Sequence, residues 1–522
     1  MAILNKSQIK EILEARFSAD LHKKLCEIPL PCDLKDCYKA ANRIKESIEK
    51  NELIAIVGDY DVDGIVSSVI LSEFFDLLGV NYIIKIPNRF TDGYGLNSQI
   101  INELEGVKLI VTVDNGITAN EAAKICKEKN IDLIITDHHI PSTILPEAYA
   151  IVNPKQKDCH FPNIEICGAQ VAWYLVGALK ETCNINIDMS SFLDILIIAI
   201  IADMMELRDL NRILLKVGIK KLNSSNRACF RAIKEFSGKR EFAFDDIGFL
   251  IAPLLNSTGR MDDATISYEF LKSKNIIQAN KILNMIEKLN ISRKAEEKML
   301  YEKSLQNIKY NDNIIIVYGD NWHEGVIGIV ASRLAKHFKK PAIVFSIDKD
   351  YAKGSARSVG KFDILNLIAM QKDKLISYGG HRGAAGLIIK SELINDFKNA
   401  INQTNENFTK FNHLDEILGE LDLCDIDMEL VNLLEFFEPY GQKNPKPTFQ
   451  IKNAKVLNLK FIGREKQHLK LILTNGKKKC EALYFNPIFI PKIGNQINII
   501  FTLSKNIYKG ISTPEILIND IL

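Results

Sequence analysis

The first 150 residues alternate short, almost wholly apolar runs with segments of helical period. Runs such as LIAIVG and KLIVTV lack the alternation of a half-exposed strand, so both of their faces should be buried. Strands of this kind that are separated by helices form a parallel sheet covered on both sides. We expect strands at 53–58, 81–87, 108–113 and 132–137, and helices at 64–78 and 119–129.

The pattern changes along the rest of the chain. Residues 168–260 are mostly helical in pattern, and 268–307 carries apolar residues at helical spacing without Pro or Gly, which predicts one long connecting helix. A second α/β pattern runs from an apolar segment at 313–320 to a predicted helix near 363–376. Beyond about residue 415, short strands alternate with Gly, Asn and Pro turns, which indicates a small antiparallel barrel, with the OB fold as a plausible form. The predicted domains are 1–215, 216–310, 311–405 and 415–522.

Composition and charge exclude some classes of protein. The 522 residues include 67 Lys and Arg against 65 Asp and Glu, a net charge of +2, so the chain is not a uniformly basic binder of polyanions. The longest apolar stretch, at 195–202, is far shorter than the ~20 residues that span a bilayer. Ten scattered cysteines without a C-x-x-C pair fit reduced thiols. We therefore expect a cytoplasmic protein without membrane contact.

A cluster of carboxylates follows the first predicted strand. DYDVDG places Asp59, Asp61 and Asp63 at alternate positions, and in an extended segment all three would point to one side. Their mutual repulsion would be costly without a cation. The alternative is an acidic surface turn.

Two further strands end on polar groups that a metal can bind. The strand at 108–113 runs into Asp114, and the strand at 132–137 is followed by His138 and His139. Parallel strands present their carboxyl ends at one edge of the sheet, where α/β folds bind ligands, so these groups should converge there. Asp203 ends the apolar stretch FLDILIIAIIAD, where an ionised group is costly to bury unless it is paired or metal-bound, although it could be a simple helix-end carboxylate.

Carboxylates and imidazoles without a thiolate suit manganese or magnesium better than structural zinc. The candidate ligands are too many for one octahedral ion that keeps waters. Two ions that share a bridging carboxylate, ~3.5–4 Å apart, could activate a water and stabilise the leaving oxygen of a phosphoester. The sequence therefore predicts a two-metal phosphodiesterase.

Several motifs in order along the chain resemble a known family. DYDVDG, VTVDNG, TDHH, VNP and IADMMELRDLNR are similar to the successive signatures of the DHH phosphoesterase family. LLNSTGRM, WHEGVIGIVASRL, GSARSV, GGHRGAAG and EPYGQKNPKPTF extend the resemblance to the RecJ branch of bacterial exonucleases. The resemblance implies an α/β fold: a parallel-sheet DHH lobe, a long connecting helix, a smaller α/β DHH-associated lobe and a C-terminal OB-like β-barrel.

The resemblance also implies roles for individual residues. Asp114 would bridge the two ions, and His139 would contact the scissile phosphate as a donor. The implied metal ligands are Asp59, Asp61, Asp63, Asp114, His138 and Asp203. The implied contacts to the DNA backbone are Arg89, Asn256, Arg260, Ser355, Arg357, Ser358, Gly380 and His381.

Two segments gain weight from this resemblance. GGHRGAAG consists largely of small residues, so a backbone can approach it closely, as in a phosphate-binding loop, although a tight turn is the plainer interpretation. In the predicted barrel, Lys470 and Lys477 to Lys479 could contact phosphates, and Phe461, Tyr484 and Phe485 could stack on bases, although aromatic residues are more commonly buried.

The implied function is a metal-dependent exonuclease that degrades single-stranded DNA from the 5′ end in recombination and repair, with two Mn²⁺ or Mg²⁺ ions. The resemblance implies a monomer that acts on single-stranded DNA, with a single-strand-binding protein and a RecQ-type helicase as partners. The 5′ polarity comes from the resemblance alone. Two alternatives stay open: a phosphodiesterase of short oligonucleotides or cyclic dinucleotides, and an inactive DNA-binding scaffold.

Overall fold

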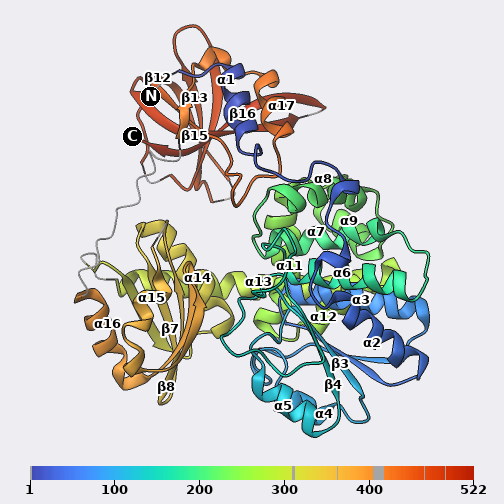
Figure 1. Cartoon of the computed structure of the whole chain (residues 1–522). Helices are drawn as coiled ribbons and strands as arrows, with labels where there is room; N and C mark the ends of the chain where they lie inside the picture. Colours follow the sequence, from blue (N-terminus) through green and yellow to red (C-terminus); the bar gives the residue numbers. More distant parts are fainter. Residues whose placement is uncertain are drawn as a thin grey trace. The chain divides into compact units, whose positions relative to one another are not determined.

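The computed structural model describes residues 3–308, 312–360, 362–403, 417–463, 465–487, 489–508 and 510–522. The predicted domain boundaries at 310/311, 405 and 415 lie outside these residues. The chain divides into two compact units (Figure 1). One unit comprises Pro29–Asp203 and Gly218–Phe411, and the other comprises Met1–Ile28, Met204–Val217 and Asn412–Leu522. The four-domain division made from the sequence stays a prediction.

A five-stranded sheet forms the first α/β lobe. Its order is β2-β1-β3-β4-β5 and each neighbouring pair is parallel, which confirms the predicted parallel sheet. Along β1 the side chains alternate between two covered faces, so Ala55 and Val57 pack with α4 and α5 in one core. The strands are β1 (Ile54–Val57), β2 (Tyr82–Lys85), β3 (Leu109–Val113), β4 (Asp132–Thr136) and β5 (Ala150–Val152).

Helices cover both faces of this sheet. α4 (Ser98–Glu103) and α5 (Asn120–Glu128) lie on the face that Ala55 and Val57 share (Figure 1). α6 (Gly168–Thr182) contacts β3 and β4. It also packs against α2 (Cys37–Glu49), α3 (Val62–Leu78) and α7 (Leu193–Ala202), and α3 contacts α7 as well.

A series of helices leads to the second lobe. The helix predicted over 268–307 is two helices, α12 and α13, because Asn275 has extended backbone geometry and its side chain accepts the Gln278 N–H as an N-cap. Propensity alone did not reveal this break. The helices are α8 (Asp209–Ser224), α9 (Ala228–Ser237), α10 (Phe244–Asp246), the π-helical turn Ile247–Ile251, α11 (Ala252–Met261), α12 (Thr265–Leu271) and α13 (Ile276–Gln306).

The second lobe contains a mixed sheet of order β6-β7-β8-β10-β9, in which β6 and β7 are parallel and the other pairs are antiparallel. The helix expected near 363–376 ends at Ala369, because the chain then enters β9. GGHRGAAG is not an open loop: it forms the end of the β9–β10 hairpin, with His381 opposite Ala384. The strands are β6 (Ile315–Asp320), β7 (Ala342–Asp348), β8 (Tyr351–Arg357), β9 (Leu375–His381) and β10 (Ala384–Lys390), and the helices are α14 (Glu324–Phe338), α15 (Ile364–Ala369) and α16 (Ile394–Gln403).

The C-terminal strands close into a barrel. The order is β12-β13-β14-β16-β15, and pairing between β12 and β15 closes the ring, as in an OB fold. One expectation needs correction: β14 and β16 run parallel, so the barrel is not wholly antiparallel. The strands are β11 (Ile417–Glu420), β12 (Thr448–Ile462), β13 (His468–Thr474), β14 (Lys479–Phe485), β15 (Gln496–Tyr508) and β16 (Ile511–Ile521).

The N-terminal helix α1 (Lys6–Ala15) packs with the barrel. Its Ile9 and Leu13 are fully buried in the same core as Leu430 of α17 (Met428–Phe436). Short 3₁₀ turns complete the fold at Leu25–Glu27, Pro31–Asp33, Met189–Phe192, Lys372–Lys374, Ser391–Leu393 and Leu423–Asp425. Among the described helices, none is both long enough and apolar enough to cross a membrane.

Candidate metal centre

The turn from β1 into α3 carries the first carboxylates. Asp61 is the N-cap of α3, and its carboxylate accepts the backbone N–H of Asp63 (2.9 Å) and of Gly64 (3.2 Å). The prediction that Asp59, Asp61 and Asp63 share an extended segment is therefore wrong, because the cap starts the helix at Val62. A Cβ on Gly64 would lie 2.5 Å from the backbone nitrogen of Asp59, so this turn requires glycine.

Asp63 is held by the N-terminus of α6. Its carboxylate accepts the N–H of Gly168 at 2.6 Å and that of Ala169 at 2.8 Å. Unpaired N–H groups at a helix N-terminus stabilise an anion. A Cβ on Gly168 would lie 2.4 Å from Oδ1 of Asp114, so the glycine also allows α6 to approach the next carboxylate.

Asp114 directly follows β3 in the left-handed region, with φ of 63°. Its N–H donates to the Thr136 carbonyl at 2.9 Å. The adjacent Asn115 donates its amide N–H groups to the carbonyls of Val57 (3.0 Å) and Val113 (2.9 Å) and so ties the ends of β1 and β3 together. These bonds fix Asp114 at the carboxyl edge of the sheet.

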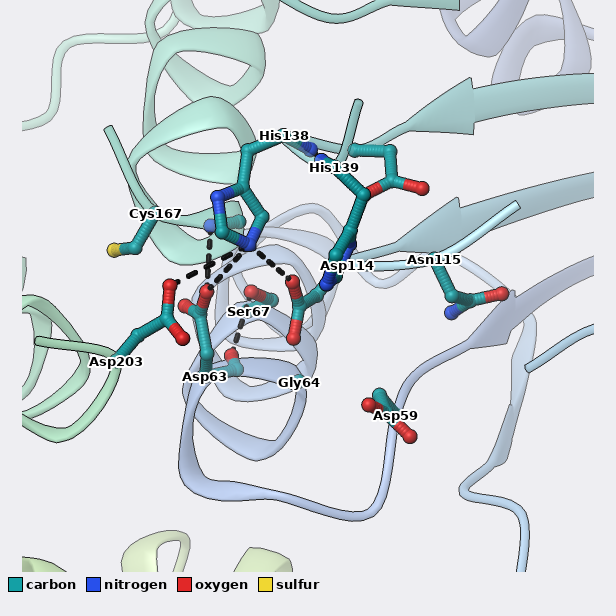
Figure 2. Close-up of polar contacts among 12 residues, drawn as sticks. Asp59, Asp63, Gly64, Ser67, Asp114, Asn115, His138, His139, Cys167 and Asp203 are labelled. Atoms are coloured by element: carbon teal, nitrogen blue, oxygen red, sulfur yellow. Dashed lines mark hydrogen bonds and ion pairs between the residues drawn. The ribbon is translucent and has the colours of Figure 1, made fainter. Parts of the chain in front are cut away.

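The segment after β4 brings the imidazoles to the same edge. Asp137 accepts the N–H of Ile117 (2.9 Å) and of His138 (2.7 Å), and its Oδ1 lies 2.7 Å from Nδ1 of His139. His138 turns the other way, and Figure 2 shows its ring among three carboxylates. Its Nε2 lies 3.2 Å from Asp114, 3.5 Å from Asp203 and 3.6 Å from Asp63.

The structure thus brings all six predicted ligands and His139 together. Three groups have ligand atoms within 4.8 Å of one another, and Asp114 and His138 each belong to two of them. Asp203 reaches the site from the end of α7. The groups are Asp63, His138 and Asp203; Asp59, Asp61 and Asp114; and Asp114, His138 and His139.

Burial makes this concentration of charge costly. It raises the pKa of Asp59 and Asp114 well above the usual value, that of Asp63 to about 6 and that of Asp203 to about 9, and the neighbouring carboxylates add to each shift. Burial and the neighbouring His139 lower the pKa of His138 to about 3. The side chains of the site therefore supply too little positive charge to balance its carboxylates.

The second histidine behaves differently. Burial alone would lower the pKa of His139, but its hydrogen bond to Asp137 and the surrounding carboxylates raise it to about 9. Because Asp137 engages Nδ1, the other ring nitrogen is the one placed to meet a substrate.

A divalent cation fits these residues. Among the described residues, Oδ1 of Asp114 and Oδ2 of Asp203 are buried oxygens without a hydrogen-bond partner. Buried polar atoms without a partner are costly, and a cation would satisfy both oxygens. Oxygen donors with one imidazole are typical of Mn²⁺ and Mg²⁺.

Three predicted phosphate-binding arginines share one electrostatic neighbourhood. The Arg89 guanidinium lies 4.1 Å over the Tyr60 ring, and its Nε donates to the Gly259 carbonyl at 3.0 Å. Burial and the charge of Arg89 lower the pKa of Arg260 to about 10, with Arg357 acting in the same direction and Asp61 in the opposite one.

Other predicted contact residues already have structural partners. Asn256 Oδ1 accepts the Val62 N–H at 3.2 Å and holds the start of α3. Arg357 Nη1 donates to Ser355 Oγ at 3.1 Å, while the Ser358 hydroxyl donates to the Phe362 carbonyl at 2.7 Å.

The β9–β10 hairpin carries the last two predicted contacts, Gly380 and His381. A Cβ on Gly380, which has φ of 142°, would lie 2.4 Å from the Ala384 carbonyl oxygen, so the hairpin requires glycine there. Burial, and then the charge of His139, lower the pKa of His381, which is therefore within electrostatic reach of the metal site.

The sequence places Asp137 at the end of its predicted strand beside His138 and His139, like Asp114 at the end of the neighbouring strand, but we assigned Asp137 no role from the sequence. Gly168 was given no role either. Gly168 had no signal in the sequence, because its importance depends on the close approach of α6 to Asp114.

Comparisons with known proteins agree with this geometry. Residues 53–200 match the DHH family, N-terminal domain; residues 311–407 match the DHHA1 domain; and residues 417–520 match the RecJ OB domain. The single-stranded-DNA-specific exonuclease RecJ of Haemophilus influenzae is 32% identical, over 96% of this chain and 93% of the relative. The chain belongs to the RecJ family.

Other RecJ proteins extend the comparison. The Bacillus subtilis RecJ is 33% identical over 96% of this chain, which spans 65% of that relative's length. The crystal structure of Thermus thermophilus RecJ in complex with Mn²⁺ matches with a TM-score of 0.83 at 25% identity, covering 99% of this chain and 76% of that one. The fold, including the OB barrel, is therefore that of RecJ.

Proposed function

We propose that this RecJ-family chain is a metal-dependent exonuclease that degrades single-stranded DNA from the 5′ end. One observation carries the proposal: six aspartate and histidine side chains from separate elements converge at the carboxyl edge of the parallel sheet, and two of their buried oxygens lack a hydrogen-bond partner among the described residues. The names of the relatives supply the substrate class, single-stranded DNA.

The proposed ligands are Asp59, Asp61, Asp63, Asp114, His138 and Asp203, for two Mn²⁺ or Mg²⁺ ions. Asp114 belongs to two of the ligand groups, which supports it as the bridge. When bound, the two ions would lower the pKa of a water molecule and offset the negative charge of the phosphodiester. Asp63 keeps its orientation through the N–H groups of α6.

His139 is the proposed donor to the scissile phosphate. Asp137 fixes the ring through Nδ1, which leaves Nε2–H to donate to a phosphate oxygen and stabilise its charge. We propose that three arginines and a serine bind the phosphates of the DNA strand, because the paired N–H groups of a guanidinium match the geometry of phosphate oxygens. These residues are Arg89, Arg260, Arg357 and Ser355. We also retain the prediction that four further residues contact the backbone of the same DNA strand: Asn256, Ser358, Gly380 and His381.

The barrel is proposed to extend the contact with single-stranded DNA. Phe461 and Phe485 are about half exposed and suit base stacking, whereas Tyr484 is buried in the barrel core, so its predicted stacking role is withdrawn. Lys470 is paired with Glu481 at 2.7 Å, and Lys478 donates to the Ile426 carbonyl at 2.6 Å. Lys477 and Lys479 are both exposed and better placed for phosphates.

The ten cysteines are free thiols, which supports a reducing, cytoplasmic compartment. A monomeric state, work in recombination and repair, and cooperation with a single-strand-binding protein and a RecQ-type helicase are retained from the resemblance.

Digestion of end-labelled DNA tests this function. We expect Mn²⁺ or Mg²⁺ to support release of nucleotides from single strands, with chelator abolishing it and the matching duplex resisting digestion. A block at the 5′ end should protect the strand, and a block at the 3′ end should not. Equal digestion of both blocked strands would refute the polarity, and activity in chelator would refute the metal requirement.

A further inference from the structure

Lys155 lies beside the proposed metal centre but is not among the proposed metal ligands or phosphate contacts. It follows β5 in the segment Asn153-Pro154-Lys155. Asn153 is fully buried, donates its side-chain amide to the His139 carbonyl at 2.9 Å and accepts the Lys155 N–H at 2.8 Å. The backbone of Lys155 is therefore fixed to the segment that carries His139.

The Lys155 side chain bridges to a second segment of the site. Its Nζ lies 3.2 Å from Oε2 of Glu165; the lysine side chain is 17% exposed and the glutamate side chain 46%. Glu165 lies just before Gly168 and Ala169, whose N–H groups hold Asp63. The ion pair thus joins the segments that position His139 and Asp63.

The ammonium group also lies near a residue of the second lobe. Burial, and then the charges of His139 and Lys155, lower the pKa of His381. Lys155 is therefore within electrostatic reach of His381 at the end of β9, in the region through which we expect the DNA strand to pass.

We propose that Lys155 binds a backbone phosphate of the DNA strand next to the metal centre, and that Glu165 holds the ammonium group until the phosphate replaces it. This inference rests on the proposed function. Lysine binds phosphate as a point charge. An ion pair with a half-exposed carboxylate contributes little to stability, so the exchange of partners costs little.

Two substitutions separate this role from a structural one. Lys155→Met removes the cation, whereas Glu165→Gln removes the competing carboxylate; both eliminate the same ion pair. In fluorescence anisotropy with a labelled oligothymidylate in chelator, we expect Lys155→Met to weaken binding and Glu165→Gln to strengthen it. A merely structural pair would shift affinity in the same direction in both variants.

Salt dependence gives the size of the effect. Each phosphate contact to a single strand contributes about 0.7 to the slope of log affinity against log salt concentration. A fourfold rise in salt should therefore weaken DNA binding by the wild type about 2.6-fold more than binding by Lys155→Met. Lys157→Met, at an exposed lysine two residues further on, is the matched control and should keep the wild-type slope.

Three results would overturn the inference: an unchanged slope in Lys155→Met, an equal loss of slope in Lys157→Met, or weaker binding by Glu165→Gln. Thermal unfolding of both ion-pair variants checks that their folds are intact. DNA binding is measured here without hydrolysis, whereas the exonuclease function is tested separately by digestion with the wild type and Mn²⁺. A failure of the Lys155 inference can therefore be distinguished from a failure of the proposed function.

Discussion

Asp114→Asn is expected to reduce manganese-dependent release of nucleotides by about a thousandfold, or about 4 kcal/mol at 1.36 kcal/mol per tenfold. Asp114 belongs to two ligand groups, so losing its charge affects both proposed ions. Asparagine keeps the size of the side chain and tolerates the left-handed backbone that Asp114 adopts, so the fold should persist. Initial rates of nucleotide release under saturating Mn²⁺ measure the effect.

The matched control is Asp36→Asn. Asp36 is also left-handed, with φ of 59°, but its carboxylate accepts the Ile151 N–H and lies outside the ligand groups. This control should keep most of the wild-type rate. Wild-type activity in Asp114→Asn would contradict the assignment of Asp114 as the bridge.

Asp114→Asn should also stabilise the metal-free protein against unfolding. Burial raises the folded-state pKa of Asp114 above its unfolded value of about 3.9, so between these two pKa values the folded protein binds more protons than the unfolded chain and its stability falls as pH rises. In chelator at slightly alkaline pH, Asp114→Asn should therefore unfold at a higher temperature than the wild type. Mn²⁺ should raise the unfolding temperature of the wild type more than that of the variant.

Gly168→Ala is expected to lower the rate about a hundredfold, the effect of displacing a catalytic group by about 1 Å. The new Cβ would lie 2.4 Å from Oδ1 of Asp114 and 2.6 Å from its Cβ, so either α6 or the carboxylate must move. Movement of α6 would also withdraw the N–H groups that hold Asp63. Isothermal titration with Mn²⁺, together with the rate, measures the loss.

Gly177→Ala on the same helix is the control. Its Cβ would lie 3.2 Å from Pro31 Cγ, far from the ligands, and alanine is a better helix former than glycine. We expect wild-type metal binding and activity from this variant. Unchanged metal affinity in Gly168→Ala would show that the close packing of α6 on Asp114 is not needed for the site.

The sequence predicted the main sheet and the location of the site because both depend on local patterns. Apolar runs without alternation identified the buried parallel strands, and polar residues at strand ends identified the edge at which Asp114 and His138 meet. The OB barrel followed from short strands between turn residues, although the parallel β14–β16 pair depends on long-range topology.

Features that depend on a single side-chain hydrogen bond were harder to predict. Asp61 and Asn275 both act as N-caps, and these caps changed an expected extended segment into a helix start and divided an expected long helix in two. The spacing of Asp59, Asp61 and Asp63 suggested candidate ligands that the structure does bring into one cluster, but the extended geometry from which they were predicted is wrong. Contacts between distant segments, such as the close approach of Gly168 in α6 to Asp114, require the folded structure.

The proposed hydrolysis depends on two divalent cations in the acidic cluster. Crystals of the wild-type protein grown with Mn²⁺ and measured at the manganese absorption edge would locate the ions directly. We predict two anomalous peaks in each chain, both within ligand distance of the Asp114 carboxylate, one beside Asp59 and Asp61 and the other beside His138. A single peak, or peaks that Asp114 does not contact, would show that the cluster is not a two-metal site bridged by Asp114.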